Sequence, residues 1–252
     1  MPTDVLPATV ATRRPAAPAR CLHCSPPLTP ASVLSGRPVL LTVLATLFIG
    51  LAASALVSRG ALLLTWDAPI QRAVEGSRTA FADGVFRRIS FFGSTKTVIV
   101  LGCVLAALAW RRCRAVGVVV LLALVSRPLI EFTLKAVVGR DRPDLERLVA
   151  GNGPSFPSGH VMAAVALWGL VPLVVALYSP DRRLWWASFV GSGALIVAIG
   201  ASRIYLGVHW FSDVIGGLIV GAFFLLGAEW VLRKRHLRDP CTCRCASAAC
   251  SD

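Results

Sequence analysis

Three cations, Lys135, Arg142 and Arg203, follow strongly apolar segments of this sequence without enough nearby carboxylates to pair them all. Cations gathered in one place imply a bound anion, and the fork of an arginine side chain grips phosphate oxygens with two parallel hydrogen bonds. Ser158 and Gly159 open another apolar segment; serine is a favourable N-cap, and glycine lets the backbone come close to a ligand. That helix would point free N–H groups and a positive dipole end at the same anion. These residues predict a phosphate-binding site.

Two histidines and an aspartate near these residues are suited to phosphoryl transfer. His209 and Asp213 are four positions apart, so in a helix they would share a face and hydrogen-bond. A carboxylate that holds one ring nitrogen fixes the tautomer and leaves the other nitrogen nucleophilic. His160 remains as the acid that protonates a departing alkoxide. A lone histidine near a helix end is more often a surface residue, so the interpretation depends on all these residues occurring together.

The composition shows what kind of scaffold must position them. Of the 252 residues, 56% are hydrophobic and only 15% are charged, and the mean hydropathy is +0.70. A soluble domain is closer to half apolar and a quarter charged. The net charge of +13 would suit nucleic acid, anionic lipid headgroups or phosphorylated substrates. Burial in a membrane favours the last two, so no nucleic-acid partner is expected.

Six apolar stretches are long enough to cross the hydrocarbon core, which takes about 20 helical residues. They lie near 38–57, 94–110, 115–136, 160–178, 184–201 and 213–232. The second is the weakest, because Lys96 would have to extend to the membrane interface. The sequence therefore predicts an all-α integral membrane protein with six transmembrane helices.

The chain is expected to divide into a disordered tail (1–37), a six-helix membrane domain (38–232) and a basic, cysteine-rich tail (233–252). Six of the eight cysteines lie in the two tails: Cys21, Cys24, Cys241, Cys243, Cys245 and Cys250. Free thiols are the favoured interpretation, and no metal site is predicted. A zinc site that joins the two tails and acylation of a juxtamembrane cysteine stay open as alternatives.

Basic residues indicate the orientation. Arginines crowd both tails, the connection between the second and third helices, and the one between the fourth and fifth. All of these fall on one side of a six-helix serpentine, which the positive-inside rule makes cytoplasmic. The loop at 59–93 also carries five arginines, and part of it is a candidate amphipathic interfacial helix. We expect both termini in the cytoplasm of a cell-membrane protein, and the phosphate-binding stretches at the extracytoplasmic face.

A charged stripe is expected inside the third helix. Arg127, Glu131 and Lys135 recur every four residues, which places them on one helical face that leads to the phosphate site. Buried charges in a membrane are costly and usually pair. Glu131 is therefore predicted to neutralise Arg127 and to orient Lys135.

The three stretches together resemble the three-part motif of the type 2 phosphatidic acid phosphatase superfamily. The pattern is Lys-x6-Arg-Pro, Pro-Ser-Gly-His and Ser-Arg-x5-His-x3-Asp. It is filled at every position, by Lys135, Arg142, Pro143, Pro157, Ser158, Gly159, His160, Ser202, Arg203, His209 and Asp213. The likeness covers roughly residues 38–232 and implies the helical membrane fold of that family.

The resemblance implies a phosphohistidine mechanism without metal or cofactor. His209 would attack phosphorus with Asp213 orienting it, and His160 would protonate the leaving group before water hydrolyses the phosphoenzyme. The remaining matches fall on the phosphate-binding positions of the family: Lys135, Arg142, Ser158, Gly159 and Arg203.

The expected function is hydrolysis of a lipid phosphate, either a phosphomonoester or a diphosphate, of the isoprenoid diphosphate, phosphatidylglycerol phosphate or phosphatidic acid class. The partners would be that lipid and the bilayer, while the oligomeric state is not readable. A phosphotransferase is a mechanistic variant. An anion transporter would leave the histidines unexplained, and vanadate-dependent haloperoxidases, which share the motif, are soluble.

Overall fold

The computed structural model describes residues 37–57, 61–144 and 146–238, and within these ranges the regular elements are all helices. In chain order these are α2 (Arg37–Val57), α3 (Ala61–Gly76), α4 (Ala80–Phe91), α5 (Thr95–Arg112), α6 (Arg114–Val138), α7 (Gly159–Trp168), α8 (Val171–Tyr178), α9 (Arg182–Tyr205) and α10 (Phe211–Arg238). The all-helical fold class is confirmed. The tail cysteines, and with them the zinc and acylation alternatives, lie outside the described residues.

Each predicted apolar stretch forms helix, although the fourth is broken. By length and composition, four segments could cross a membrane: α6, Gly159–Ala176, α9 and Phe211–Leu232. Helices α4 and α5 pass the same test as a pair bent by 44°, and the apolar part of α2, Leu40–Leu56, is shorter. The described helices thus supply four or five candidate spans, and the count of six stays a prediction.

The fourth stretch breaks between α7 and α8 at Gly169 and Leu170. A Cβ at Gly169 would lie 2.5 Å from both the Leu225 side chain and the Val165 carbonyl, so the glycine lets α10 approach there. Further along, α10 extends to Arg238, beyond the predicted boundary at 232. Hydropathy marks apolar segments, but it does not report such local packing.

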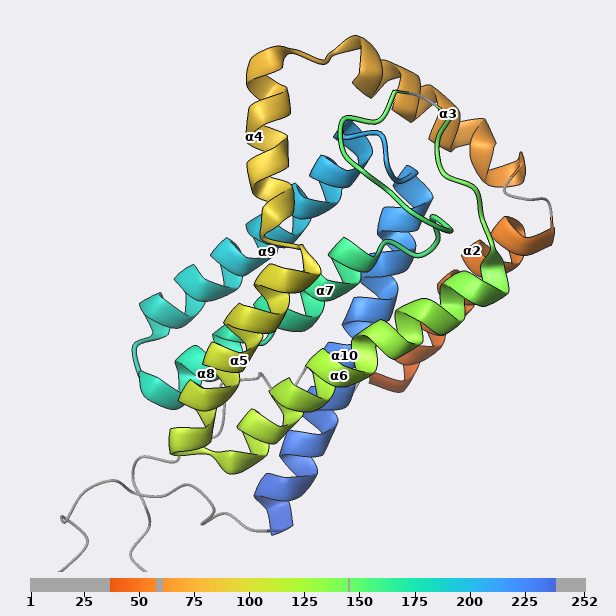
Figure 1. Ribbon diagram of the computed structural model, residues 1–252. Coiled ribbons are helices and arrows are strands. Elements are labelled where there is room, and N and C mark those ends of the chain that lie inside the picture. The colour runs from red at the N-terminus through yellow and green to blue at the C-terminus, as the bar shows by residue number, and fades with distance from the viewer. Residues whose placement is uncertain (1–36, 58–60, 145, 239–252) are drawn as a thin grey trace, which may run out of the picture.

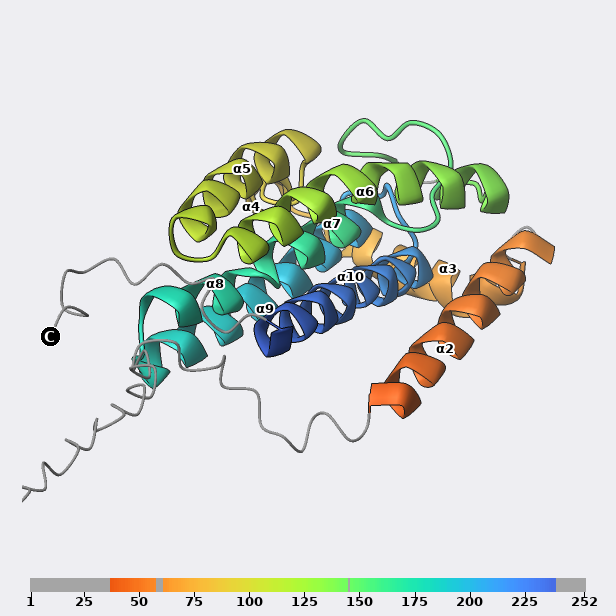
Figure 2. The ribbon, with the colours of Figure 1, turned by 90° about the horizontal axis from the view of Figure 1, so that it is seen from below.

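Helix α7 is the centre of the bundle and packs against α5, α6, α9 and α10 (Figure 2). Its residues from Val161 to Leu167 are all buried. On α10, a Cβ at Gly221 would lie 2.5 Å from the Val165 Cβ, and one at Gly217 would lie 2.8 Å from the Ser158 carbonyl. Small residues thus bring α10 against the beginning of α7.

The chain reverses so that the segments with unusual chemistry meet at one end of the bundle. The α6–α7 loop, the α9–α10 connection and α3 lie together at that end, and the α5–α6 turn and α8–α9 connection lie at the other (Figure 1). Within the predicted loop at 59–93, part of which was a candidate amphipathic helix, the chain forms the two helices α3 and α4, and α4 leads into α5. Gly139 caps the C-terminus of α6, and its φ of 61° is the left-handed conformation that glycine adopts freely.

Candidate active site

Arg142 is held in the α6–α7 loop by backbone carbonyls. Its Nε donates to the Gly153 carbonyl at 2.9 Å, and Nη1 donates to the Val208 carbonyl at 2.6 Å. Nη2 donates to the carbonyls of Asn152 and Pro154 at 3.0 and 3.3 Å. None of these partners carries a full charge. The guanidinium is therefore fixed in place with its positive charge still available to an anion.

Arg203 lies in the last turn of α9 and is 5% exposed. Its Nη1 donates to the Ser90 hydroxyl of α4 at 2.5 Å. Its Nε is buried and has no hydrogen-bond partner among the described residues. A buried donor without a partner is costly, so this N–H is suited to a group that arrives from outside.

Ser158 takes the N-cap position of α7, as predicted, but its side chain makes no capping hydrogen bond. Its hydroxyl is fully buried and, like the Arg203 Nε, has no partner in the described part of the chain. Backbone contacts fix the residue instead, because its N–H donates to the Asp213 carbonyl at 3.0 Å. The hydroxyl is thus left free for a ligand.

Gly159 serves a purpose that its sequence context did not reveal. A Cβ at this position would lie 1.9 Å from Glu131 Oε1, so the missing side chain leaves room for the Glu131 carboxylate. That carboxylate pairs with Arg127 at 2.6 Å and with Lys135 at 2.8 Å. The predicted stripe on α6 is confirmed, and it leads to the beginning of α7.

His209 lies in the short connection between α9 and α10 and is 2% exposed. Its Nδ1 is 3.4 Å from Asp213 Oδ2, and its Nε2 is 3.4 Å from Arg142 Nη1. Because α10 begins at Phe211, the two residues do not share one continuous helix as expected. A backbone N–H, from Trp210 at 2.9 Å, fixes the Asp213 carboxylate instead.

Burial lowers the pKa of His209 to about 4. The hydrogen bond and charge of Asp213 oppose this shift, whereas Arg203 and Arg142 add to it. The imidazole is therefore neutral near pH 7, which is the form that has a lone pair for attack.

His160 is the second residue of α7 and is half-buried. It lies within electrostatic range of Arg203, His209 and Lys135. Gly93 of the α4–α5 connection borders it, since a Cβ there would lie 3.4 Å from the His160 Cβ.

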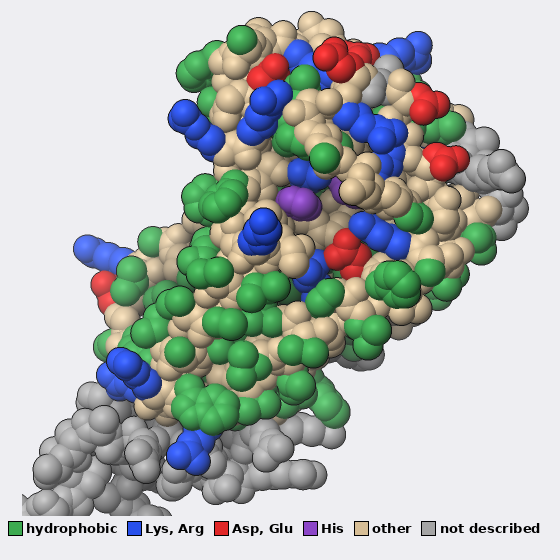
Figure 3. Space-filling model, in the orientation of Figure 1, with side chains coloured by type: hydrophobic (Ala, Val, Ile, Leu, Met, Phe, Trp, Pro, Cys, Tyr) green, Lys and Arg blue, Asp and Glu red, His purple; other side chains and the backbone are tan. Residues whose placement is uncertain are grey.

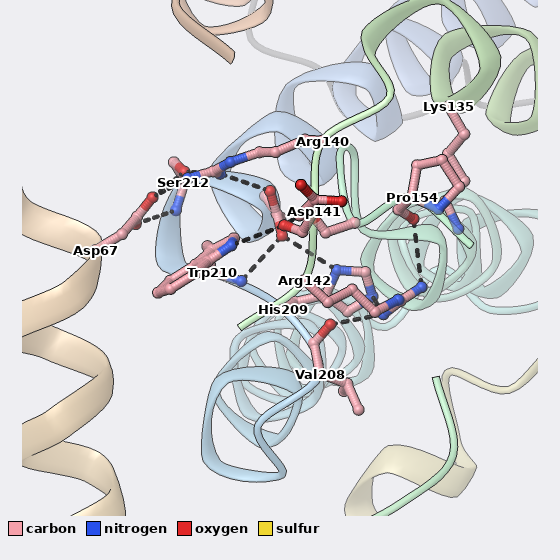
Figure 4. Close-up of polar contacts among 12 residues, drawn as sticks. Asp67, Lys135, Arg140, Asp141, Arg142, Pro154, Val208, His209, Trp210 and Ser212 are labelled. Atoms are coloured by element: carbon pink, nitrogen blue, oxygen red, sulfur yellow. Dashed lines mark hydrogen bonds and ion pairs between the residues drawn. The ribbon is translucent and has the colours of Figure 1, made fainter. Parts of the chain in front are cut away.

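The sequence-predicted residues therefore meet in one place, although they come from four separate segments. Arg203 interacts electrostatically with Arg142, and Arg142 with Glu131 beside Lys135. In Figure 3, histidine side chains lie in a hollow between lysine and arginine side chains. Figure 4 shows Lys135 reaching from α6 toward Pro154, with Arg142 and His209 alongside. Convergent cations and a neutral imidazole form a site that can bind a phosphate and attack it.

Residues 116–237 match the model of the PAP2 superfamily, a range that contains every predicted site residue. The chain belongs to the PAP2 superfamily. Its fold is similar to the crystal structure of a transmembrane PAP2-type phosphatidylglycerolphosphate phosphatase from Bacillus subtilis. The TM-score is 0.71 at 26% sequence identity, over 77% of this chain and 96% of that one.

Two relatives of this chain have names that specify a lipid phosphate as substrate. Phosphatidylglycerophosphatase B of Bacillus subtilis is 29% identical, over 64% of this chain and 81% of that protein. The putative undecaprenyl-diphosphatase YbjG of Escherichia coli is 33% identical, over 46% of this chain and 57% of that protein. With its apolar helices and its membrane relatives, this PAP2 protein is a multi-pass membrane protein.

Sequence reasoning missed a buried polar cluster behind the PAP2 site. Arg140 donates to Asp67 and to Asp213, each at 2.8 Å, and to the Ser212 hydroxyl at 2.6 Å. Ser90, the partner of Arg203, was likewise not predicted. Asp67 and Ser90 lie outside the range that matches the PAP2 model. Asp67 comes shortly after the apolar start of α3, but nothing in the sequence indicates which residue would pair with it.

Within the described ranges, no group of three or more His, Cys, Asp or Glu side chains is placed to hold a metal ion. The acidic side chains of the PAP2 site, Asp67, Asp213 and Glu131, are each paired with an arginine.

Proposed function

We propose that this protein hydrolyses the phosphate or diphosphate of a membrane lipid through a covalent intermediate on His209, without a metal ion. The observation that carries the proposal is that two buried polar groups of the site have no hydrogen-bond partner in the described chain. The Ser158 hydroxyl and the Arg203 Nε lack partners in the described chain, and they belong to the same group of residues as a neutral His209. A phosphoryl group would satisfy both and would lie within reach of the imidazole.

In the first step, the His209 Nε2 lone pair attacks phosphorus while the bond from phosphorus to the lipid oxygen breaks. Asp213 accepts a hydrogen bond from Nδ1–H and stabilises the imidazolium that forms. His160 gives its proton to the departing lipid oxygen. The products are a lipid alcohol, or a lipid monophosphate from a diphosphate, and phosphohistidine.

In the second step, water attacks the phosphohistidine. His160, now neutral, takes a proton from that water, and the phosphorus–nitrogen bond returns its electron pair to His209. Inorganic phosphate leaves. Lys135, Arg142 and Arg203 stabilise the negative charge on the transferring oxygens in both steps, a function that Mg²⁺ serves in many phosphoryl-transfer enzymes.

A lipid is the proposed substrate because the site lies at the end of long apolar helices, where a headgroup meets water. The two relatives act by name on phosphatidylglycerophosphate and undecaprenyl diphosphate. Both classes, together with phosphatidic acid, belong in the substrate panel.

The test is phosphate release by the purified full-length chain in detergent with excess EDTA, from those three lipids. We expect turnover without added metal and none from His209→Ala. Arg142→Ala and Arg203→Ala should each lose at least about 100- to 1,000-fold in kcat, as for a transition-state donor. The matched control is Arg88→Ala, an exposed arginine of α4. Turnover that survives His209→Ala, or that requires Mg²⁺, would overturn the mechanism.

A further inference from the structure

One guanidinium behind the His209–Asp213 pair is shared between two carboxylates. Arg140 Nη1 donates to Asp213 Oδ1 of α10 at 2.8 Å, and its Nη2 donates to Asp67 Oδ2 of α3 at 2.8 Å (Figure 4). The arginine side chain is 1% exposed and both aspartate side chains are 0% exposed. Water therefore does not screen these charges.

Ser212 holds the geometry of this cluster. Its backbone N–H donates to Asp67 Oδ1 at 2.9 Å, and its hydroxyl bridges Arg140 Nη1 and Asp67 Oδ2. The Trp210 ring lies 5.5 Å from the Arg140 guanidinium carbon. Arg140 is thus held between the carboxylates of Asp67 and Asp213 and cannot pair with Asp213 alone.

The charge balance has a consequence for His209. Two carboxylates and one guanidinium leave one formal negative charge, and the cluster meets the imidazole through Asp213 Oδ2, 3.4 Å from Nδ1. If Asp67 were neutral, Arg140 would cancel the charge of Asp213. If Arg140 were neutral, two negative charges would face the site.

We propose that Arg140 and Asp67 are positioning residues that together set the charge which Asp213 presents to His209. The functional part of this proposal rests on His209 being the nucleophile. Asp67 takes up part of the Arg140 charge, which keeps Asp213 anionic enough to stabilise the imidazolium. Arg140 limits that negative charge, so that the site still admits a phosphate.

Several other charged groups face His209 and stay constant in the test. Arg142 of the α6–α7 loop lies 3.4 Å from Nε2, and Arg203 of α9 acts on the ring electrostatically. His160 of α7 is also within electrostatic range. A change in the titration of His209 therefore reports the altered cluster.

The experiment is a ¹⁵N NMR titration of the histidine ring nitrogens in the full-length protein in detergent, with the His209 signal identified by its loss in His209→Gln. Asp67→Asn reduces the cluster charge to zero and should lower the midpoint by about 1 pH unit. Arg140→Gln makes it −2 and should raise the midpoint by about the same amount. The double variant restores −1 and should return to the wild-type value.

Asp83→Asn is the matched control, because it removes a carboxylate that bonds the Tyr205 hydroxyl and should leave the midpoint unchanged. Gel filtration and melting temperature identify any variant that does not fold. Comparison of the double variant with either single variant that folds is still a test. The midpoint of the double variant must lie above that of Asp67→Asn and below that of Arg140→Gln. Coinciding midpoints, or a double variant further from wild type than either single one, would overturn the proposal.

The titration reads the resting protein and needs no turnover, so it separates this inference from the proposed function. If the wild-type protein releases no phosphate while the midpoints shift as expected, the proposed phosphatase function is wrong and the proposed charge sharing stands. If the protein hydrolyses the lipid but the midpoints do not shift, the phosphatase function stands and the proposed charge sharing is wrong.

Discussion

Ser90 shows how one hydroxyl outside the motif can control a cation within it. Its hydrogen bond to Arg203 Nη1 is the contact that ties this guanidinium to α4. Hydrogen bonds to charged groups contribute about 1.5–3 kcal/mol. If that contribution falls on the bound transition state, Ser90→Ala should lower kcat/KM by about 10-fold or more.

The measurement is phosphate release from phosphatidic acid, with Ser90→Thr as the variant that keeps the hydroxyl and restores activity. Ser77→Ala removes an exposed serine near the start of the same helix and should have no effect. Equal activity in Ser90→Ala and wild type would show that Arg203 needs no such support.

At the scale of single residues, the sequence indicated which side chains would meet and that Glu131 pairs with Lys135, but it did not indicate the contacts of Arg140 and Ser90. Spacing and residue type were sufficient to expect Lys135, Arg203 and His209 in one site. Spacing does not report that Arg140 meets Asp67, 73 positions away. Such a contact depends on how α3 crosses the end of the bundle, and no local pattern encodes it.

The contact between α6 and α7 is the element-scale feature that the site depends on most. Gly159→Ala would place a methyl group 1.9 Å from the Glu131 carboxylate, so this carboxylate must leave its place or the two helices must move apart. We expect loss of the Glu131–Lys135 pair, a lower melting temperature and at least a 10-fold loss of turnover. Gly191→Ala is the control, because a Cβ there in α9 meets no atom within 4 Å.

That outcome would be measured by thermal unfolding and phosphate release on the same preparations. Normal turnover in Gly159→Ala would mean that the helices adjust without cost to the site. At this scale, hydropathy predicted where the apolar helices lie, but not the break at Gly169 or the bounds of α3 and α4, for which only a candidate amphipathic helix within 59–93 was expected. These depend on side chains that meet across the bundle.

The arrangement of the whole molecule suggests its orientation in the membrane. Exposed arginines mark the end opposite the site: Arg111, Arg112, Arg114, Arg182 and Arg183. We propose that this end is cytoplasmic and that the site faces outward. Green fluorescent protein fused after the last residue should then fluoresce in cells, and a periplasmic phosphatase fused there should be inactive. The opposite pattern would reverse the orientation.

The central claim is a phosphoryl group bound covalently to His209. The most direct test is rapid quenching of the full-length protein into alkaline detergent during turnover of a lipid carrying ³²P in the reacting phosphoryl group. We predict base-stable, acid-labile label on the peptide that contains His209, and none in His209→Ala. Turnover without a labelled enzyme, or label on another residue, would contradict the account.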